Sequence, residues 1–208
     1  LSGEHKGIRK GHAKGVCAEG EFVPSDEVDR IRWMKVGKAA QKLTYNSERR
    51  VLAAALVTPH TTPLVIVRHG KAMLRRNWTG RDQERRLTSR GRRQARELIA
   101  LLDAYGVAAL ASSSSTRCAE TLAPYAKFAG LKVVTEDVLT EEEGTVRPKD
   151  VRKFMTRLLA GMDRPTAICG HRPVLPQMFT GLGLEPRAMV VGEAIVLHRD
   201  DDGQIVAR

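Results

Sequence analysis

The chain has 208 residues, of which 42% are hydrophobic and 28% charged, and 35 Lys and Arg against 24 Asp and Glu give it a net charge of +11. This length allows one sizeable core, or one domain and a fragment. No apolar run approaches the roughly 18 to 20 residues that span a bilayer, and the N-terminus shows no secretory hydrophobic region, so we predict no membrane association.

The cysteines favour a reducing compartment. There are three, Cys17, Cys118 and Cys169, an odd number that does not suit a disulfide framework. We therefore predict a cytoplasmic location. The sequence has no Cys-x-x-Cys pair and no His-rich cluster, so we predict no metal site.

The first 63 residues divide into three parts. Residues 1–20 are rich in Lys, Gly and His without a clear period, and we predict a tail. Residues 21–57 are predicted as a small α+β segment, with a strand at 30–34, a helix from 36, and a second helix capped by Asn46 or Ser47. Val51, Leu52 and Leu56 should share one face of that second helix. Residues 58–63, which include two prolines, are predicted to be a linker.

Part of this N-terminal region resembles the C-terminal end of a Nudix hydrolase domain. The resemblance rests on the stretch Glu-Phe-Val-Pro-Ser-Asp-Glu-Val-Asp at 21–29, the strand around Trp33 and the closing helix. The metal-binding Nudix box is absent, because the one Glu-Glu run, at 141–143, lies far downstream and lacks the preceding Arg-Glu. We interpret residues 21–57 as a remnant without its own chemistry, whereas a complete Nudix domain would need Mg²⁺. The alternative is a small subdomain unrelated to Nudix domains.

The most informative motif follows a short apolar run at 64–66, which predicts a buried strand. The next residues are Val67, Arg68, His69, Gly70 and Lys71. Open α/β sheets place their ligand crevice at the carboxyl ends of strands. A neutral histidine there is a competent nucleophile toward phosphorus, and an adjacent arginine presents a planar fork that matches two phosphoryl oxygens.

The loop at 71–86 is dense in arginine, with Asp82 and Glu84 as its only acids. Loops that follow an active-site strand usually line the crevice, so this loop should hold a substrate with more than one phosphate. The substrate contacts predicted there and at the strand ends are Gly70, Lys71, Arg75, Arg76, Asn77, Thr79, Gly80, Arg81 and Gly170.

The remaining pattern alternates helix and strand. A helix capped by Thr88 should end at Gly106, and a helix at 116–129 should carry Arg117 in its first turn and stop at Gly130. The other predicted elements are strands at 107–111, 131–134 and 166–169, helices at 149–159 and 174–180, and a terminal hairpin formed by 189–198 and 204–206. This alternation predicts an α/β fold of three αβα layers with a mainly parallel sheet, in addition to the small N-terminal α+β segment.

Four motifs in this order resemble the histidine phosphatase superfamily, the phosphoglycerate mutase-like proteins, over residues 63–208. They are Arg68-His69-Gly70, then Leu87-Thr88 with Gly91 and Gln94-Ala95, then Arg117, then Gly170-His171. The resemblance implies a phosphatase domain at 64–208 that needs no cofactor and forms a phosphohistidine on His69. Arg68, Arg117 and His171 would hold the phosphoryl oxygens, and the environment of His171 should favour its protonation.

The resemblance places the general acid after a Leu-x-Glu pattern, which here is Leu139-Thr140-Glu141. Glu141 is the candidate, with Glu142 close behind. The alternative is that Glu141, Glu142 and Glu143 form a solvated acidic turn. The sequence alone leaves this choice open.

The substrate is ranked rather than fixed. A Nudix remnant before this domain resembles the actinobacterial MutT-type tandem proteins, which puts nucleoside polyphosphates or dinucleoside polyphosphates first. The short segment at 130–165 predicts an open pocket that also suits a phosphohistidine protein, as in SixA-type phosphatases. Two alternatives are not hydrolases: a binding module for phosphorylated ligands, and a basic scaffold for nucleic acid. Three Tyr, two Trp and four Phe offer little for stacking bases, so we rank nucleic acid below the others.

Overall fold

The structure is a computed structural model that describes residues 30, 32, 34–57 and 60–207. The chain divides into two compact units, Leu1–Pro59 and His60–Arg208, and each is described by itself. The predicted tail, the stretch at 21–29 and Trp33 lie outside the described residues. No helix in the described ranges is long and apolar enough to cross a membrane.

The described part of the first unit contains two helices, α1 (Val36–Lys42) and α2 (Asn46–Val57). Ala39, Leu43 and Leu52 form a small buried cluster. The predicted apolar face of α2 is narrower than expected, because Val51 and Leu56 are exposed. The predicted cap is also displaced: Asn46 is already helical, and the preceding Tyr45 amide donates to Glu48 Oε2 over 3.2 Å.

The predicted strand at 30–34 is wrong where it can be checked, since the described residues 30, 32 and 34 are not in a strand.

The second unit is built on a six-stranded sheet in the order β3-β2-β4-β1-β5-β6. The strands are β1 (Thr62–Arg68), β2 (Ala109–Ser113), β3 (Val133–Glu136), β4 (Thr166–Gly170), β5 (Ala194–Arg199) and β6 (Ile205–Ala207). The first four pair in parallel, and β5 and β6 are antiparallel. The predicted α/β class with a mainly parallel sheet is therefore confirmed.

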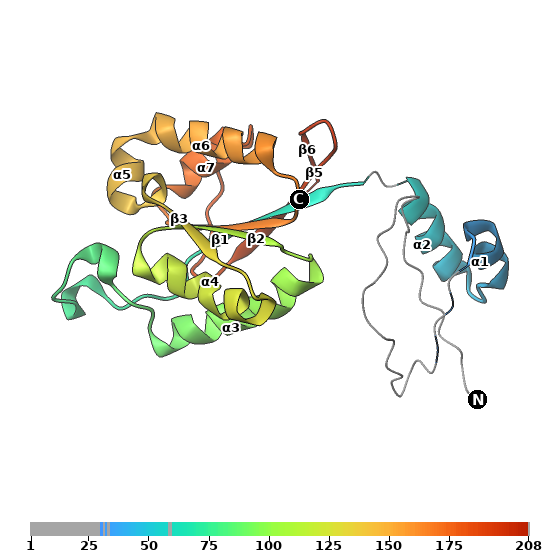
Figure 1. Cartoon of the computed structure of the whole chain (residues 1–208), viewed down its shortest axis with the longest axis horizontal. Coiled ribbons are helices and arrows are strands. Elements are labelled where there is room, and N and C mark those ends of the chain that lie inside the picture. The colour runs from blue at the N-terminus through green and yellow to red at the C-terminus, as the bar shows by residue number, and fades with distance from the viewer. Residues whose placement is uncertain (1–29, 31, 33, 58–59, 208) are drawn as a thin grey trace. The chain divides into compact units, whose positions relative to one another are not determined.

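Helices cover both faces of this sheet (Figure 1). One face carries α3 (Ser89–Ala104) and α4 (Thr116–Ala129), and the other carries α5 (Glu141–Val146), α6 (Pro148–Gly161) and α7 (Leu175–Gly181). Successive side chains of a strand point to opposite faces, so β1 contributes to two cores. Val65 and Val67 pack in the cluster with α3 and α4, whereas Leu64 and Ile66 pack in the cluster with α6 and α7.

Two helix boundaries of this unit are set by a capping residue and a glycine that can be recognised in the sequence. Thr88 caps α3 by accepting a hydrogen bond from the Gly91 amide over 3.2 Å. Gly130 ends α4 with a left-handed φ of 68°, a conformation that costs glycine little. The predicted helix at 116–129 is thus confirmed at both ends.

Several predicted boundaries shift by about two residues or more, including the strand predicted at 131–134, which is β3 at Val133–Glu136. The strand predicted at 107–111 is β2, which lies two residues later. β1 begins at Thr62, inside the segment predicted as a linker. Residues 189–193, predicted to be strand, instead fold back against the end of β1, where the Gly192 amide donates to Arg68 O and His69 O.

Candidate active site

Two histidines meet at the carboxyl ends of neighbouring strands. Arg68 on β1 lies in register with Gly170 on β4, so His69 and His171 follow directly on adjacent strands. The His69 amide donates to Gly170 O over 3.2 Å, and the two imidazole centroids are 5.1 Å apart. The structure therefore brings together the two strand-end motifs that are about a hundred residues apart in the sequence.

The contacts of His69 define its tautomer. Its Nδ1 lies 2.8 Å from Gly70 O. A carbonyl oxygen can only accept, so Nδ1 carries the hydrogen and Nε2 keeps its lone pair. Burial lowers the pKa of His69 to about 4, and the nearby charges of Arg117, Arg68 and Arg85 act in the same direction. At neutral pH His69 is therefore a neutral imidazole with an available ring nitrogen.

His171 is completely buried, with Nε2 2.9 Å from Ser113 Oγ and 3.4 Å from Cys118 Sγ. Burial, together with the charge of Arg117, lowers its pKa to about 2. The prediction that the environment of His171 favours its protonation is wrong. Desolvation and neighbouring cations both oppose a second positive charge there.

Two arginines complete the cationic side of the site. Arg117 is fully buried, and Arg68 donates through Nη1 to Met189 O in the folded-back segment. The Nε atoms of both guanidinium groups are buried and have no hydrogen-bond partner among the described residues. Buried donors without partners are costly, and a bound anion would satisfy them.

Two carboxylates lie against Arg117. Its Nη2 is 3.1 Å from Asp82 Oδ2 and 3.2 Å from Glu141 Oε2, and its Nη1 donates to Asp82 O over 2.7 Å. Glu141 is the first residue of α5, while Glu142 and Glu143 are exposed. Of the three glutamates considered as general acid, the structure places Glu141 on Arg117.

Comparison with known proteins identifies the family. The model of the histidine phosphatase superfamily (branch 1) matches residues 64–160. This chain belongs to the histidine phosphatase superfamily.

An "8-oxo-(d)GTP phosphatase" of Mycolicibacterium smegmatis is 36% identical over 158 residues, which cover 76% of this chain and 49% of the relative. The chain thus spans about half the length of that relative. The family match does not include residues 21–57, where the Nudix interpretation stays a prediction.

Solved structures share the fold at low identity. The protein histidine phosphatase SixA complexed with tungstate aligns with a TM-score of 0.57 at 19% identity, over 69% of this chain and 92% of that one. A mycobacterial glucosyl-3-phosphoglycerate phosphatase aligns with a TM-score of 0.54 at 16% identity, over 70% and 93% of the two chains. These likenesses support the α/β fold and leave the substrate to other arguments.

The loop at 71–86, which is predicted to hold a substrate with more than one phosphate, has most of its arginines paired with carboxylates. Arg75 donates to Asp82 and Glu141, both over 2.8 Å, and Arg85 donates to Asp82 over 3.0 Å. Arg81 pairs with Glu84, and Arg86 lies 3.3 Å from Glu120. The other predicted contacts at the loop tip, Arg76, Asn77, Thr79 and Gly80, are exposed.

Asp82 is the site residue that the sequence analysis missed. Burial alone would raise the pKa of this carboxyl, but hydrogen bonds from Arg75 and Arg85 and the charge of Arg117 hold it well below its usual range. The available signal was that Asp82 is one of only two acids in an arginine-rich loop. Its contact with Arg117 depends on packing between segments 35 residues apart.

Residues of the second motif, at 87–95, contact the backbone that follows His69. A Cβ built on Gly91 would lie 2.2 Å from Lys71 O, so only glycine allows this approach of α3 to the backbone after His69. Gln94 accepts from the Lys71 amide and donates to Val191 O. The motif residues Thr88, Gly91 and Gln94 thus fix the segments on either side of the site.

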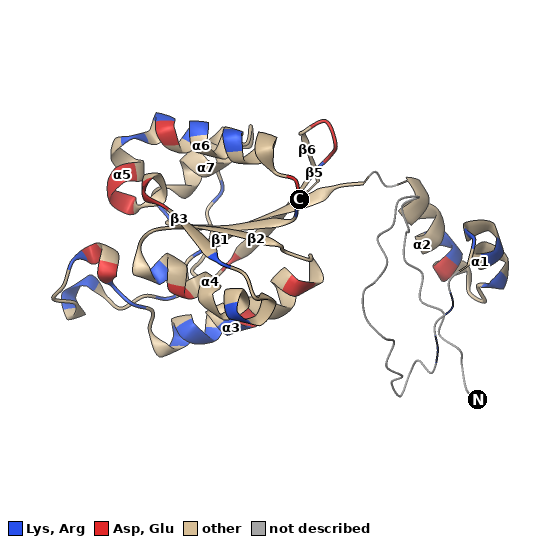
Figure 2. Cartoon of the chain, viewed as in Figure 1, with Lys and Arg blue, Asp and Glu red and all other residues tan. Residues whose placement is uncertain are grey.

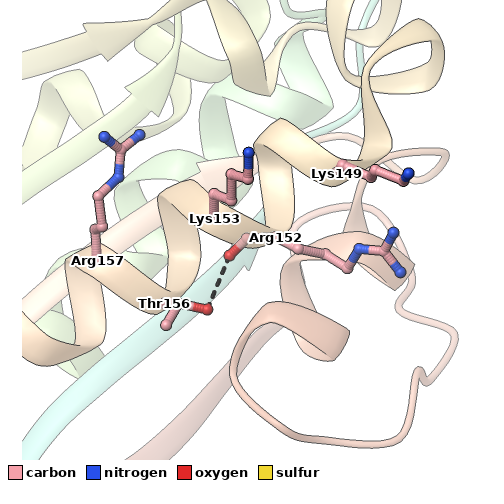
Figure 3. Close-up of a pocket in the computed structure, with 5 residues that line it drawn as sticks. All are labelled: Lys149, Arg152, Lys153, Thr156 and Arg157. Carbon is pink, nitrogen blue, oxygen red and sulfur yellow. Dashed lines mark hydrogen bonds between the residues drawn. The ribbon is translucent and has the colours of Figure 1, made fainter.

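A second cationic region lies on the outer surface of α6 (Figure 3). It surrounds a shallow cavity of about 530 Å³ lined by Lys149, Arg152, Lys153, Thr156 and Arg157. None of the predicted site residues lines it. Among the described residues, no group of three or more His, Cys, Asp or Glu is placed to hold a metal ion.

Proposed function

We propose that this domain hydrolyses phosphoric anhydrides or esters through a phosphohistidine formed on His69. One observation carries the proposal: an available Nε2 on His69 lies in a site whose two buried guanidinium groups, Arg68 and Arg117, each keep an unpaired N–H. A nucleophile and unsatisfied anion-binding donors at one sheet edge suit a phosphoryl group.

The reaction would proceed in two displacements. His69 Nε2 attacks phosphorus, the bond from phosphorus to the leaving oxygen breaks, and its electron pair departs with that oxygen. Water then attacks the phosphohistidine, the P–N bond breaks, and phosphate leaves as His69 regains its neutral form. Arg68 and Arg117 would donate hydrogen bonds to the equatorial oxygens, where negative charge is spread in the transition state.

His171 would contribute as a hydrogen-bond donor to the bound phosphoryl group. With its low pKa it enters the reaction uncharged, and a phosphoryl dianion beside it would favour gain of a proton. Its buried contact with Ser113 fixes the ring close to His69.

Glu141 is the proposed proton donor to the leaving group and acceptor from water in the second step. Its place at the start of α5, against Arg117, puts it at the edge of the same site. An anhydride leaves more readily than an alcohol, so a nucleoside polyphosphate would depend less on this acid.

We propose that the substrates are nucleoside polyphosphates or dinucleoside polyphosphates. The domain would act on them without a metal or cofactor. The support is the 36% identity to a protein named 8-oxo-(d)GTP phosphatase. A cytoplasmic location is proposed from the cysteine usage.

The alternative substrate is a phosphohistidine protein. It is supported by the likeness to SixA, which at 19% identity is a likeness of fold. We therefore rank it second. A binding module without turnover is the remaining competitor, because the pocket would persist in it.

The test is phosphate release from a panel: nucleoside di- and triphosphates, a dinucleoside polyphosphate, a phosphohistidine protein and an aryl phosphate. We expect the fastest release from the nucleotides and a loss of at least about 10³-fold in His69→Ala. The exposed His60 provides a matched control, His60→Ala, which should stay within twofold. No His69-dependent release from any compound would reject the hydrolase proposal.

A further inference from the structure

Four charged side chains form a closed ring at the mouth of the site. Asp82 contacts Arg75 over 2.8 Å and Arg117 over 3.1 Å, and Glu141 contacts the same two guanidinium groups over 2.8 and 3.2 Å. Each carboxylate therefore bridges an exposed arginine of the loop and the fully buried arginine of α4. The ring joins the tip of the loop to the body of the domain.

Asp82 occupies the hydrogen-bond donors of Arg117 that would bind an incoming phosphoryl group. Its carboxylate lies against Nη2 and its carbonyl accepts from Nη1, so both terminal nitrogens are engaged. A carboxylate offers anionic oxygens to a guanidinium much as a phosphoryl group does. The two anions therefore compete for the same donors.

The loop keeps Asp82 in place. Its base is closed by a bridge between Ala72 and Leu87 and by the Met73 amide, which donates to Arg86 O. The Arg85 guanidinium donates to Met73 O and to Asp82, which fastens the tip to the base. The carboxylate is thus held beside Arg117 by a tethered segment, at a high effective concentration.

We propose that Asp82 is an internal competitor for the phosphoryl group at Arg117, which lowers the affinity of the site for phosphate and speeds release of the phosphate product. The effect on phosphate affinity stands by itself, whereas the effect on product release rests on the proposed hydrolase function. Asp82 here is an affinity-determining residue that acts through Arg117.

Replacing Asp82 by a phosphoryl group at Arg117 should cost little free energy, because Asp82 has other partners. When a phosphoryl group takes Arg117, Asp82 keeps its hydrogen bonds from Arg75 and Arg85, so its charge stays paired. When phosphate leaves, Asp82 returns to Arg117, and the buried guanidinium is not left without a counter-charge. This arrangement lets strong cations bind substrate without retaining product.

The experiment compares Asp82→Asn with Glu84→Gln. Both changes remove one negative charge from the same loop, but Glu84 pairs with the exposed Arg81. Orthophosphate binding to the full chain is measured by calorimetry at fixed ionic strength. We expect Asp82→Asn to bind orthophosphate about tenfold more tightly than wild type, and Glu84→Gln to stay within about twofold.

Steady-state kinetics give a second readout. Asp82→Asn should lower the inhibition constant of orthophosphate and the KM together, and it should lower kcat if product release limits turnover. A merely structural role of Asp82 would raise KM instead. Asp82→Ser is the second variant if the asparagine protein does not fold.

Several results would overturn the inference. They are unchanged or weaker orthophosphate binding in Asp82→Asn, equal tightening in Glu84→Gln, or no binding by any variant. Its failure is separable from that of the proposed function. His69-dependent hydrolysis with no gain in Asp82→Asn would reject the competitor alone, whereas tighter binding without any hydrolysis would reject the hydrolase alone.

Discussion

Two regions with several Lys and Arg, the strand ends with the loop that follows β1 and the helix α6, differ in burial and in ion pairing; their basic residues are blue in Figure 2. At the strand ends, Arg117 is fully buried and held by Asp82 and Glu141. On α6, Lys149, Lys153 and Arg157 are exposed, Arg152 is half-buried, and none of the four has an ion pair within the described residues.

Charge density alone therefore does not identify the candidate active site. A guanidinium in a desolvated setting interacts with an anion far more strongly than a hydrated surface ammonium, whose field is screened within about 8 Å at physiological salt. The strand-end region also has His69, the proposed nucleophile. The α6 region lacks a histidine, and its cations extend along one helix instead of converging.

The largest contrast should come from the same substitution in each region. Arg117→Lys removes the planar fork and should lower kcat by about 10² to 10³-fold, the usual loss for a transition-state donor. Arg152→Lys on α6 should change kcat less than twofold. Both are measured as phosphate release from the best substrate of the panel. Similar losses in the two variants would mean that the regions act alike on catalysis.

Low pH should reduce the free energy of unfolding through the strand-end region and not through the cations of α6. The pKa of His69 is about 4 when folded and about 6.5 when unfolded, so below pH 6.5 the unfolded chain binds a proton that the folded chain refuses. Stability from this residue is complete above pH 6.5 and is lost as the pH falls to about 4, by about 3 kcal/mol. Denaturant unfolding at several pH values measures the loss.

His69→Gln should reduce that pH dependence by about half without abolishing it, because glutamine does not titrate whereas His171, whose pKa is also lowered by burial, still loses stability over the same range. Lys153→Gln on α6 is the control, and its pH dependence should match wild type, because Lys153 is exposed and lies outside the strand-end region. An unaltered acid loss in His69→Gln would place its origin elsewhere.

The sequence was sufficient for the parts of the fold that depend on local chemistry. The apolar run at 64–66 identified the buried β1, and Thr116 to Gly130 marked both ends of α4. The convergence of His69 and His171 also followed, because parallel strands bring their carboxyl ends to one edge.

What the sequence could not show depends on burial and on contacts between distant segments. Arg117 and Arg152 are the same residue type in the sequence, and only packing makes the first fully buried. Asp82 reaches Arg117 across 35 residues, and the pattern at 189–193 does not reveal that this segment folds back to receive Arg68. The low pKa of His171 was missed because the sequence does not show how completely its ring is desolvated.

The smallest expected difference comes from replacing one glycine by alanine in each region. A Cβ at Gly91 would meet Lys71 O at 2.2 Å, whereas one at Gly161, the last residue of α6, would meet nothing within 4 Å. Gly91→Ala must push α3 away from the nucleophile loop, and overpacking of this kind costs about 1 to 3 kcal/mol. Gly161→Ala should be neutral or stabilising by up to about 1 kcal/mol, since alanine restricts the unfolded chain.

Thermal and denaturant unfolding give both stabilities, and phosphate release shows whether the Gly91→Ala strain reaches His69. We expect activity to fall in Gly91→Ala even at temperatures where the protein is folded, because Lys71 and Gly70 follow the nucleophile directly. Full activity in a destabilised Gly91→Ala would mean that the loop absorbs the displacement before it reaches the imidazole. In that case the close approach of α3 serves stability, and the geometry of the site depends on the strand ends alone.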